Sequence, residues 1–467
     1  MRDHTRVMTS IKFTSGLAPL CLLALAACSS LPRIVPDMAP ATTATQVDGA
    51  HGPLSPARSR AILEGLERGA EDTNIFDRHL ALEQAVSDSP LLTGNRVRLL
   101  EDGPETYRAM FTAIMAARDH INMETYILED DEVGQRFADA LIEKQRQGVQ
   151  VNLIHDSVGT LGTPAEFFQR LRDNGVRTLE FNPVNPATAK AGWDVNQRDH
   201  RKLLIVDGRT VFLGGINISG VYSGSSFRGN SKTRPDGALP WRDTDLQIDG
   251  PVVAEFQKLF LETWQAQKGE PLAPRDYFPQ QQPQGNEVVR AIGSSPDDDF
   301  SLIYVTLLSA INSAETEVLL TNAYFVPDPQ LLAALKAAAA RGVDVRLVLP
   351  GKTDSELVFN AGRSYYDQLL SDGVILFERQ GALMHAKTAV IDGVWSTVGS
   401  TNLDWRSFLH NQEVNAVVLG TEFGDRMRAA FAGNVARSDQ VTLEQWRRRS
   451  IVLRLKERFA RVWQYWL

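Results

Sequence analysis

Apolar and polar positions along the chain follow two alternating patterns. Short runs of apolar residues predict strands, and segments in which apolar residues recur every three or four positions predict helices. From residue 97 the two patterns take turns, which is typical of an α/β fold with a mainly parallel sheet flanked by helices. The expected order is a strand at 97–100, a helix at 107–118, a strand at 120–128, a helix at 133–147 and a strand at 149–155.

The same alternation of predicted strands and helices returns in the second half of the chain. A strand at 317–325, a helix at 330–340 and a strand at 343–349 repeat the earlier order. The repeat extends to a short sequence motif, since the Gly-Val-x-Val of 148–151 recurs at 342–345. A single duplication of this kind predicts two similar lobes, which can pack about a pseudo-two-fold axis as a homodimer would.

Changes in composition divide the chain further. Residues 31–57 are rich in Pro, Ala, Thr and Ser and predict a flexible tether, while Ser55-Pro56 is typical of a helix start. Several prolines predict a linker at 268–286. The expected segments are a signal peptide (1–27), a tether with N-terminal helices (28–94), a first lobe (95–267), the linker (268–286), a second lobe (287–440) and a C-terminal helix (441–467).

Composition and charge narrow the class of protein. A chain of 467 residues with 43% apolar residues suits two or three globular domains. Its net charge of −8 disfavours a general nucleic-acid binder, which needs a basic surface. The two cysteines, Cys21 and Cys28, both lie near the N-terminus. The body of the chain therefore has neither an internal disulfide nor a cysteine-ligated metal site.

The N-terminus has the layout of an export signal. Basic residues precede an apolar run at 16–27, which is too short to span a bilayer. Small residues followed by Cys28 resemble the lipobox of bacterial lipoproteins, where the cysteine is lipidated and becomes the mature N-terminus. We expect a lipid-anchored protein of the bacterial cell envelope that faces the periplasm, and Ser29 favours the outer membrane. A plain signal peptide with an incidental cysteine is the alternative.

The chemistry is predicted by a motif that occurs twice with identical spacing. Each copy has His-x-Lys, then Asp, then a pair of small residues and an Asn. The first copy consists of His200, Lys202, Asp207, Gly214-Gly215 and Asn217, and the second of His385, Lys387, Asp392, Gly399-Ser400 and Asn402. One His-x-Lys alone carries little information, whereas a repeat of the whole pattern is highly specific.

These residue types suit a phosphodiester. Histidine and lysine two positions apart on a strand face the same side, and the small residues allow a turn that returns each asparagine to the same pocket. If the lobes face each other, one imidazole can attack phosphorus while the other protonates the leaving oxygen. The two lysines and two asparagines can hold the developing negative charge.

We expect neither a metal nor a cofactor at this site. Lysine is a poor metal ligand, and no carboxylates cluster with the histidines in the sequence. Asp207 and Asp392 belong to the catalytic motif and close its strands. For each of them we expect a structural ion pair rather than direct chemistry.

The two copies of the motif, which we call the boxes, resemble those of the phospholipase D superfamily. The resemblance covers about residues 95–436. Finer words at 123–127, 322–328 and 400–408 resemble bacterial cardiolipin synthases, although Ala323 stands where that family has proline. The resemblance implies one carboxylate for each histidine, which fixes its tautomer. The matching places after the two boxes are occupied by Asp243 and Glu413, with Asp245 as the alternative to Asp243.

The resemblance also implies a phosphatidyltransferase. His200 would form a phosphatidyl-histidine, and His385 would protonate the departing alcohol and then activate the hydroxyl of a second lipid. Phosphatidylglycerol would thus yield cardiolipin, with phosphatidylethanolamine as a further candidate substrate. The choice of His200 as nucleophile rests on the resemblance. Oligomeric state stays open, and a monomer suffices for one active site.

Other functions compete with this prediction. Water as the acceptor would make the protein a phospholipase D that releases phosphatidic acid. A phosphodiesterase acting on nucleic acid is disfavoured by the acidic charge, and a degenerate binding module by the two intact boxes. The Gly- and Ser-rich loop at 222–240 has no assigned role.

The C-terminal segment is basic on an acidic protein. It carries seven basic residues against two acidic ones. Its apolar positions fall on one helix face, at Val452, Leu455, Phe459, Val462 and Trp466. Together with further aromatic residues, this pattern predicts a helix that lies on an anionic lipid surface. Packing of the apolar face on the second lobe is the alternative.

Overall fold

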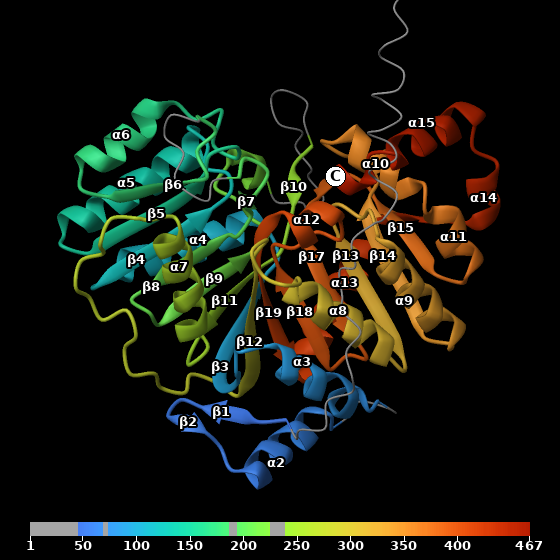
Figure 1. The fold of residues 1–467 in the computed structure, drawn as a ribbon, viewed down its shortest axis with the longest axis horizontal. Helices are drawn as coiled ribbons and strands as arrows, with labels where there is room; N and C mark the ends of the chain where they lie inside the picture. The colour runs from blue at the N-terminus through green and yellow to red at the C-terminus, as the bar shows by residue number, and fades with distance from the viewer. Residues whose placement is uncertain (1–44, 69–72, 186–193, 225–238) are drawn as a thin grey trace, which may run out of the picture.

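The computed structural model describes residues 45–68, 73–185, 194–224 and 239–467, which form two lobes side by side (Figure 1). The predicted signal peptide, Cys28 and most of the 222–240 loop lie outside these residues. Within the described ranges, no helix is both long and apolar enough to cross a membrane. The α/β class with two similar lobes, predicted from the sequence, is confirmed.

The first lobe is built on a mixed sheet. From edge to edge its strands are β6 (Arg177–Phe181), β5 (Gln150–Asp156), β4 (His120–Thr125), β8 (Leu203–Val206), β9 (Thr210–Gly214), β11 (Asp245–Asp249) and β3 (Leu91–Leu100). β4, β5 and β6 are parallel because helices connect them, and the remaining neighbours are antiparallel.

The second lobe repeats this order strand for strand. Its sheet runs β15 (Ile375–Arg379), β14 (Asp344–Pro350), β13 (Glu317–Asn322), β17 (Lys387–Ile391), β18 (Trp395–Gly399), β19 (Asn411–Leu419) and β12 (Glu287–Ser294). Again the first three strands are parallel and the others antiparallel. A further strand, β20 (Ser438–Val441), pairs with β15 at the outer edge.

Backbone hydrogen bonds join the two lobes at three places. β3 pairs with β12, so the two sheets are continuous. The short strand β7 (Arg198–Asp199) of the first lobe pairs with β19 of the second. Reciprocally, β10 (Trp241–Arg242) of the first lobe pairs with β16 (Leu383–Met384) of the second. Equivalent elements thus exchange contacts, as expected for lobes related by a pseudo-two-fold axis.

Helices cover the sheets on both sides (Figure 1). Aspartates or serines cap many of them, as at Asp131, Ser301 and Asp328. The helices of the first lobe are α4 (Gly103–Ala116), α5 (Glu132–Arg146), α6 (Ala165–Asp173) and α7 (Val253–Ala266). The helices of the second lobe are α8 (Leu302–Ser313), α9 (Pro329–Ala340), α10 (Glu356–Arg363), α11 (Tyr366–Ser371), α12 (Trp405–Leu409), α13 (Thr421–Val435), α14 (Leu443–Arg447) and α15 (Ile451–Arg461).

One of the three apolar cores belongs to both lobes. It combines Phe256 and Phe260 of α7 with Phe423 of α13 and with strand residues from each sheet, such as Ile205 and Val390. Of the other two cores among the described residues, one lies within the first lobe, and one combines the second lobe with residues nearer the N-terminus such as Ile75 and Leu91. Because the shared core is fully buried, the lobes are held at a fixed distance, and the surface between them is a rigid place for a site.

The N-terminal region departs in part from the sequence prediction. Residues 47–53 are not a flexible tether, because β1 (Val47–Gly49) and β2 (Gly52–Pro53) form a hairpin and β1 adds to β3. The apolar side chain of Val47 is buried there, which outweighs the loop-like composition around it. Helix α2 (Pro56–Leu66) starts as predicted, capped by the Ser55 hydroxyl. The 268–286 segment contains no strand or helix.

Candidate active site

Both histidines lie at the junction between the lobes. His200 stands between β7 and β8, and its backbone N–H donates to the carbonyl of Gln412 at 2.9 Å. His385 stands between β16 and β17, and its N–H donates to the carbonyl of Arg242 at 2.7 Å. Each box is therefore fixed by backbone of the opposite lobe. The histidines themselves lie just outside the regular strands.

The carboxylates that contact the histidines are also exchanged between lobes. Nδ1 of His200 lies 3.0 and 3.1 Å from the two oxygens of Glu413, which belongs to the second lobe. Nδ1 of His385 lies 2.6 Å from Oδ2 of Asp243, which belongs to the first. Both carboxylates are buried, and each engages Nδ1, so Nε2 is the ring nitrogen left for chemistry.

Asp245 does not take part in either pair. Its Oδ1 accepts a hydrogen bond from the backbone N–H of Ile216 at 3.1 Å, and its side chain lies against Gly214. Of the two aspartates weighed from the sequence, Asp243 is the one beside His385.

The small residues of the boxes make room for the carboxylates. A Cβ at Gly215 would lie 2.3 Å from Oδ1 of Asp243, so a side chain there would displace the carboxylate. Ser400 is the equivalent residue in the second box, and its hydroxyl donates to Glu413. Neither Gly214 nor Gly215 has a positive φ. The predicted role as a permissive turn is wrong for this pair, because close approach of the carboxylate is what requires glycine.

Each lysine contacts the backbone of the histidine in its own box. Nζ of Lys202 donates to the carbonyl of His200 at 2.6 Å, and Nζ of Lys387 donates to the carbonyl of His385. Burial is the main cause that lowers the pKa of Lys202 to about 7 and that of Lys387 to about 8. Near neutral pH the two ammonium groups are therefore close to their titration range, and an anion in the pocket would favour their charged forms.

The two asparagines differ in how they are held. Oδ1 of Asn217 accepts from the backbone N–H of Ile127 at 3.0 Å, and Nδ2 donates to the Tyr222 hydroxyl at 3.2 Å. Asn402 lines the pocket, and its buried Oδ1 has no hydrogen-bond partner among the residues placed in the structure. Asn217 is thus fixed in orientation, while the amide of Asn402 is freer to meet a ligand.

One pocket brings these groups together. It has a volume of about 470 Å³ and receives side chains from both lobes, including His200, His385, Asn217 and Asn402. Its wall is partly apolar, with further lining from Val158, Val195, Val358, Trp466 and Leu467. The predicted convergence of the histidines and asparagines is therefore seen in the structure.

The electrostatics of the two histidine pairs are unequal. Burial lowers the pKa of His200 to about 4, helped by Lys202 and opposed by Glu413. Burial also raises the pKa of Asp243 to about 7, opposed mainly by Lys387. At neutral pH His200 is a neutral imidazole, whereas the pair of Asp243 and His385 is poised to keep a proton. The pKa of the His385 imidazole itself is lowered, chiefly by burial and then by Lys387.

The aspartates of the boxes have a different partner from the one predicted. Asp207 accepts hydrogen bonds from the backbone N–H groups of residues 118–120 at 2.8 to 3.1 Å. Asp392 does the same for residues 315–317, at 2.8 to 3.2 Å. Neither carboxylate is in an ion pair with any side chain that the structure describes, so that prediction is wrong. Both residues have a positive φ and cap the start of the neighbouring strand.

Sequence reasoning missed two residues of the site, Tyr222 and Arg198. The Tyr222 hydroxyl lies 3.2 Å from Nδ1 of His385 and contacts Asn217 as well. Arg198 also lines the pocket, two positions before His200. The repeat could not reveal Arg198, because Leu383 stands at the matching position of the second box.

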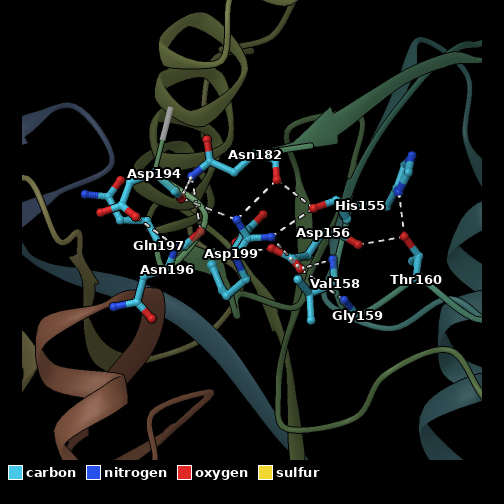
Figure 2. A network of polar contacts seen from close by, with 12 residues as sticks. His155, Asp156, Val158, Gly159, Thr160, Asn182, Asp194, Asn196, Gln197 and Asp199 are labelled. Carbon is cyan, nitrogen blue, oxygen red and sulfur yellow. Dashed lines mark hydrogen bonds and ion pairs between the residues drawn. The ribbon is translucent and has the colours of Figure 1, made fainter. Parts of the chain in front are cut away.

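A polar network joins Val158 at the pocket rim to Asp199, beside the first box (Figure 2). Its centre is Asp156 at the end of β5, which accepts from the N–H of Val158 at 2.8 Å and from that of Asp199 at 2.9 Å. The guanidinium of Arg198 lies 3.6 Å from the Asp156 carboxylate and donates to the carbonyl of Asn182 at 3.1 Å. Asp156 therefore fixes the rim turn and the residue before His200 together.

The described residues contain no group of three or more His, Cys, Asp or Glu side chains that could hold a metal ion. The polar groups that meet at the pocket are imidazoles, carboxylates, amides and the guanidinium groups of Arg198 and Arg406, and the two ammonium groups contact the backbone of the histidines. Such a set can form a bond to phosphorus, transfer a proton and hold negative charge.

Fold and site together define a two-lobed protein of the phospholipase D type. A family model described as "Cardiolipin synthase, PLD-like domain" matches residues 110–230 and 307–434. The cardiolipin synthase of Geobacillus sp. (strain WCH70) is 34% identical over 386 residues, which cover 82% of this chain and 74% of the relative. Cardiolipin synthase 1 of Bacillus anthracis is 33% identical over 419 residues, covering 86% and 79%. The chain belongs to the cardiolipin synthase family of phospholipase D-like proteins.

A solved structure shares the fold. The phosphatidylserine synthase of Haemophilus influenzae Rd KW20 superposes with a TM-score of 0.62 at 13% identity, covering 82% of this chain and 99% of that one. The two-lobed architecture is thus common to this chain and to a protein of very different sequence.

Proposed function

We propose that the protein is a phosphatidyltransferase that makes cardiolipin from phosphatidylglycerol. The observation that carries the proposal is the exchange of histidine–carboxylate pairs between the lobes, with both imidazoles on one pocket. The similarity to cardiolipin synthases over most of the chain supports the choice of substrate.

The first half-reaction forms a covalent intermediate. Nε2 of His200 attacks the phosphorus of one phosphatidylglycerol, and a nitrogen–phosphorus bond forms as the bond to the headgroup glycerol breaks. His385 gives its proton to the departing glycerol oxygen. The products of this step are free glycerol and phosphatidyl-His200.

The second half-reaction transfers the phosphatidyl group. The pair of Asp243 and His385, which has now given up one proton, takes a proton through His385 from a headgroup hydroxyl of a second phosphatidylglycerol, and that oxygen attacks phosphorus. The nitrogen–phosphorus bond breaks, His200 is released as the neutral imidazole, and cardiolipin is formed. One phosphodiester replaces another, so the reaction needs no nucleotide energy source.

The unequal environments of the two histidines support this division of roles. A nucleophile must be unprotonated, and the low pKa of His200 favours that form at neutral pH. Glu413 supports His200 as a carboxylate that also accepts hydrogen bonds from Ser400 and, at 3.3 Å, from Asn411. The raised pKa of Asp243 favours a proton on its pair with His385, as a general acid requires.

Lys202, Lys387, Asn217 and Asn402 would hold the charge that develops on the non-bridging oxygens. The lysines would act at short range, where low exposure strengthens their field. Asn402 lines the pocket and would donate to such an oxygen through its Nδ2, whereas Nδ2 of Asn217 already donates to the Tyr222 hydroxyl.

The protein would act in the bacterial cell envelope, facing the periplasm. A lipid on Cys28 would anchor it there, with the outer membrane favoured by Ser29. These residues lie outside the described ranges, and the proposal for them rests on the lipobox-like sequence. Mass analysis of the N-terminal peptide from membranes tests it. An unmodified, uncleaved chain recovered from the cytoplasm would refute the anchor.

Product analysis tests the proposed reaction. The purified full chain is incubated with vesicles of phosphatidylglycerol, with or without phosphatidylethanolamine, and the lipids are separated by chromatography. We expect cardiolipin and an equal amount of glycerol. Phosphatidic acid as the main product would instead identify a phospholipase D. The His200→Ala and His385→Ala variants serve as controls and should each lose activity by several orders of magnitude.

A further inference from the structure

The C-terminal helix α15 has its apolar face outward. Of the five residues that define this face, Leu455 is 60% exposed and Phe459 is 66% exposed, and Val452, Val462 and Trp466 are more than half exposed as well. The face does not pack on the second lobe, so the packing alternative considered from the sequence is wrong. An exposed apolar stripe of this size on a fixed helix marks a surface that binds a partner.

The opposite side of the helix faces the protein, where Ala460 joins the apolar core of the second lobe. Glu457 is buried and pairs with Arg449 at 2.7 Å, and Ala460, one turn on, is buried as well. Beyond the helix, the carbonyl of Leu467 accepts from the N–H of Arg406 at 3.0 Å. The helix is therefore attached through the side that carries Glu457 and Ala460, and the exposure of the other side is a property of the folded protein.

The exposed face leads directly to the catalytic pocket. Trp466 and Leu467, which follow α15, line that pocket. On the other lobe, Val158 and Val195 line the same pocket and are partly exposed, and the neighbouring Leu161 is 73% exposed. Apolar side chains thus stand on both sides of the pocket. We call this set, together with the outward face of α15, the docking face.

The charge of the docking face indicates what it binds. Lys456 and Arg458 are exposed between the apolar residues of α15, and the whole C-terminal segment has seven basic residues against two acidic ones. The rest of the protein is acidic, since the net charge of the chain is −8. Apolar and aromatic side chains flanked by basic ones match the interface of an anionic bilayer.

We propose that the docking face binds the surface of an anionic lipid bilayer and holds the mouth of the catalytic pocket against it. Lipid headgroups would then reach the two histidines while their acyl chains stay in the membrane, with both lobes in contact with lipid. The inference rests on the proposed function only for the identity of the lipid that enters the pocket. Contact with the membrane can be measured without activity.

Site-specific labels test this orientation in the full chain. An environment-sensitive fluorophore is attached at Leu455→Cys and at Leu161→Cys, one on each lobe, and the protein is bound to phosphatidylglycerol vesicles that contain a lipid-borne quencher. The matched control is His51→Cys, an exposed position between β1 and β2, at the opposite end of the molecule from α15 (Figure 1). The parent chain, with its cysteines confined to the N-terminal segment, gives the labelling background.

We expect quenching at 455 and 161 but not at 51. Quenching at 51 alone, or at none of the three, would overturn the proposal. A label at 455 that is shielded from water but not quenched by lipid would show that a second copy of the protein covers the face, and would overturn it too. None of these outcomes depends on catalysis, so a failure here is distinct from a failure of the product analysis.

Charge reversal tests the role of the basic residues. At about 1 kcal/mol for each basic residue near an anionic surface, Lys456→Glu with Arg458→Glu should lower the ratio of quenched to unquenched label at 455 by about 30-fold or more. The matched control reverses two exposed arginines of α2, Arg58→Glu with Arg60→Glu, and should change little. Turnover of a short-chain, monomeric phosphatidylglycerol should be the same in both variants. An equal loss of quenching in both would refute the proposed contact.

Discussion

At the scale of single residues, the two boxes are alike in sequence but unequal in their surroundings. His200 faces a glutamate that accepts further hydrogen bonds, and His385 faces an aspartate with a raised pKa. Burial changes pKa values in both pairs. It lowers the pKa of the His200 imidazole, which favours the neutral form, and it raises the pKa of Asp243, which favours a proton on the pair with His385. The division of roles proposed above therefore depends on two carboxylates outside the boxes, Glu413 and Asp243.

The pH dependence of turnover follows from these pKa shifts. Below a pH of about 4, His200 gains a proton and loses the lone pair with which it attacks, so activity should be lost as pH falls through that value. Above a pH of about 7, the pair of Asp243 and His385 loses its proton, so activity should decline there as well. The value of kcat/KM for short-chain phosphatidylglycerol, measured across this range, checks both limbs. A rate that stays constant well above the pKa of Asp243 would contradict the assignment of the acid.

The His385→Asn variant should trap the intermediate. With a donor whose leaving group needs no protonation, the first step can still proceed, whereas the second step lacks its base. Peptide mass analysis after quenching should find a phosphatidyl group on His200. A donor-derived adduct on any other residue would overturn the division of roles, and His200→Ala is the control that should show none.

At the scale of elements, the position of each histidine is set by two strands. The first box connects β7 to β8, and the second connects β16 to β17. β7 and β16 pair with the opposite lobe, and the strands that follow them enter their own sheets. Asp207 and Asp392 fix the far ends of these strands by capping backbone N–H groups. The histidines are thereby held between two sets of backbone hydrogen bonds.

A substitution at Gly215 tests whether the backbone of the first box must lie close to the Asp243 carboxylate. In Gly215→Ala the new Cβ would meet Asp243 at 2.3 Å, so the carboxylate should move away from His385. We expect kcat to fall by at least about 100-fold, by analogy with the loss of the orienting carboxylate in other histidine catalysts. The matched control is Gly162→Ala, where nothing lies within 4 Å of the added methyl group. Similar activity in both variants would show that Asp243 does not need this approach.

At the scale of the whole molecule, neither lobe contains a complete site. Each histidine depends on a carboxylate of the other lobe, and the shared core keeps the two lobes at a fixed distance. The docking face proposed above also draws on both lobes. The duplication therefore produced one active site with two unequal halves instead of two independent ones.

A double-mutant cycle across the lobes measures this dependence. Glu413→Gln and His200→Ala should each lower kcat/KM, and the double variant should be little worse than His200→Ala alone, because the carboxylate acts through the imidazole. As a control pair, Asp207→Ala and Glu413→Gln share no contact and should combine additively. Additive losses for His200 and Glu413 would show that the pair does not act as a unit.

The sequence by itself determined the fold class, the repeat and the residues that carry the chemistry. Apolar periodicity reports the faces that are buried, and a motif repeated with identical spacing needs no structure to be recognised. For that reason the histidines, lysines and asparagines could be named in advance, whereas Asp243 and Glu413 were named from the resemblance to a known family. The start of α2 was predicted as well, since capping is a local property.

Only the tertiary structure decided which groups meet. The exchange of Glu413 and Asp243 between the lobes, the partners of Asp207 and Asp392, and the contact of Tyr222 with His385 all join residues far apart in the chain. The same holds for α15, whose periodic pattern fits a buried and a membrane-facing helix equally well. The spacing of residues in the sequence determines which side of a helix or strand each side chain is on. Which residues or which surface lie against that side depends on how the two lobes pack.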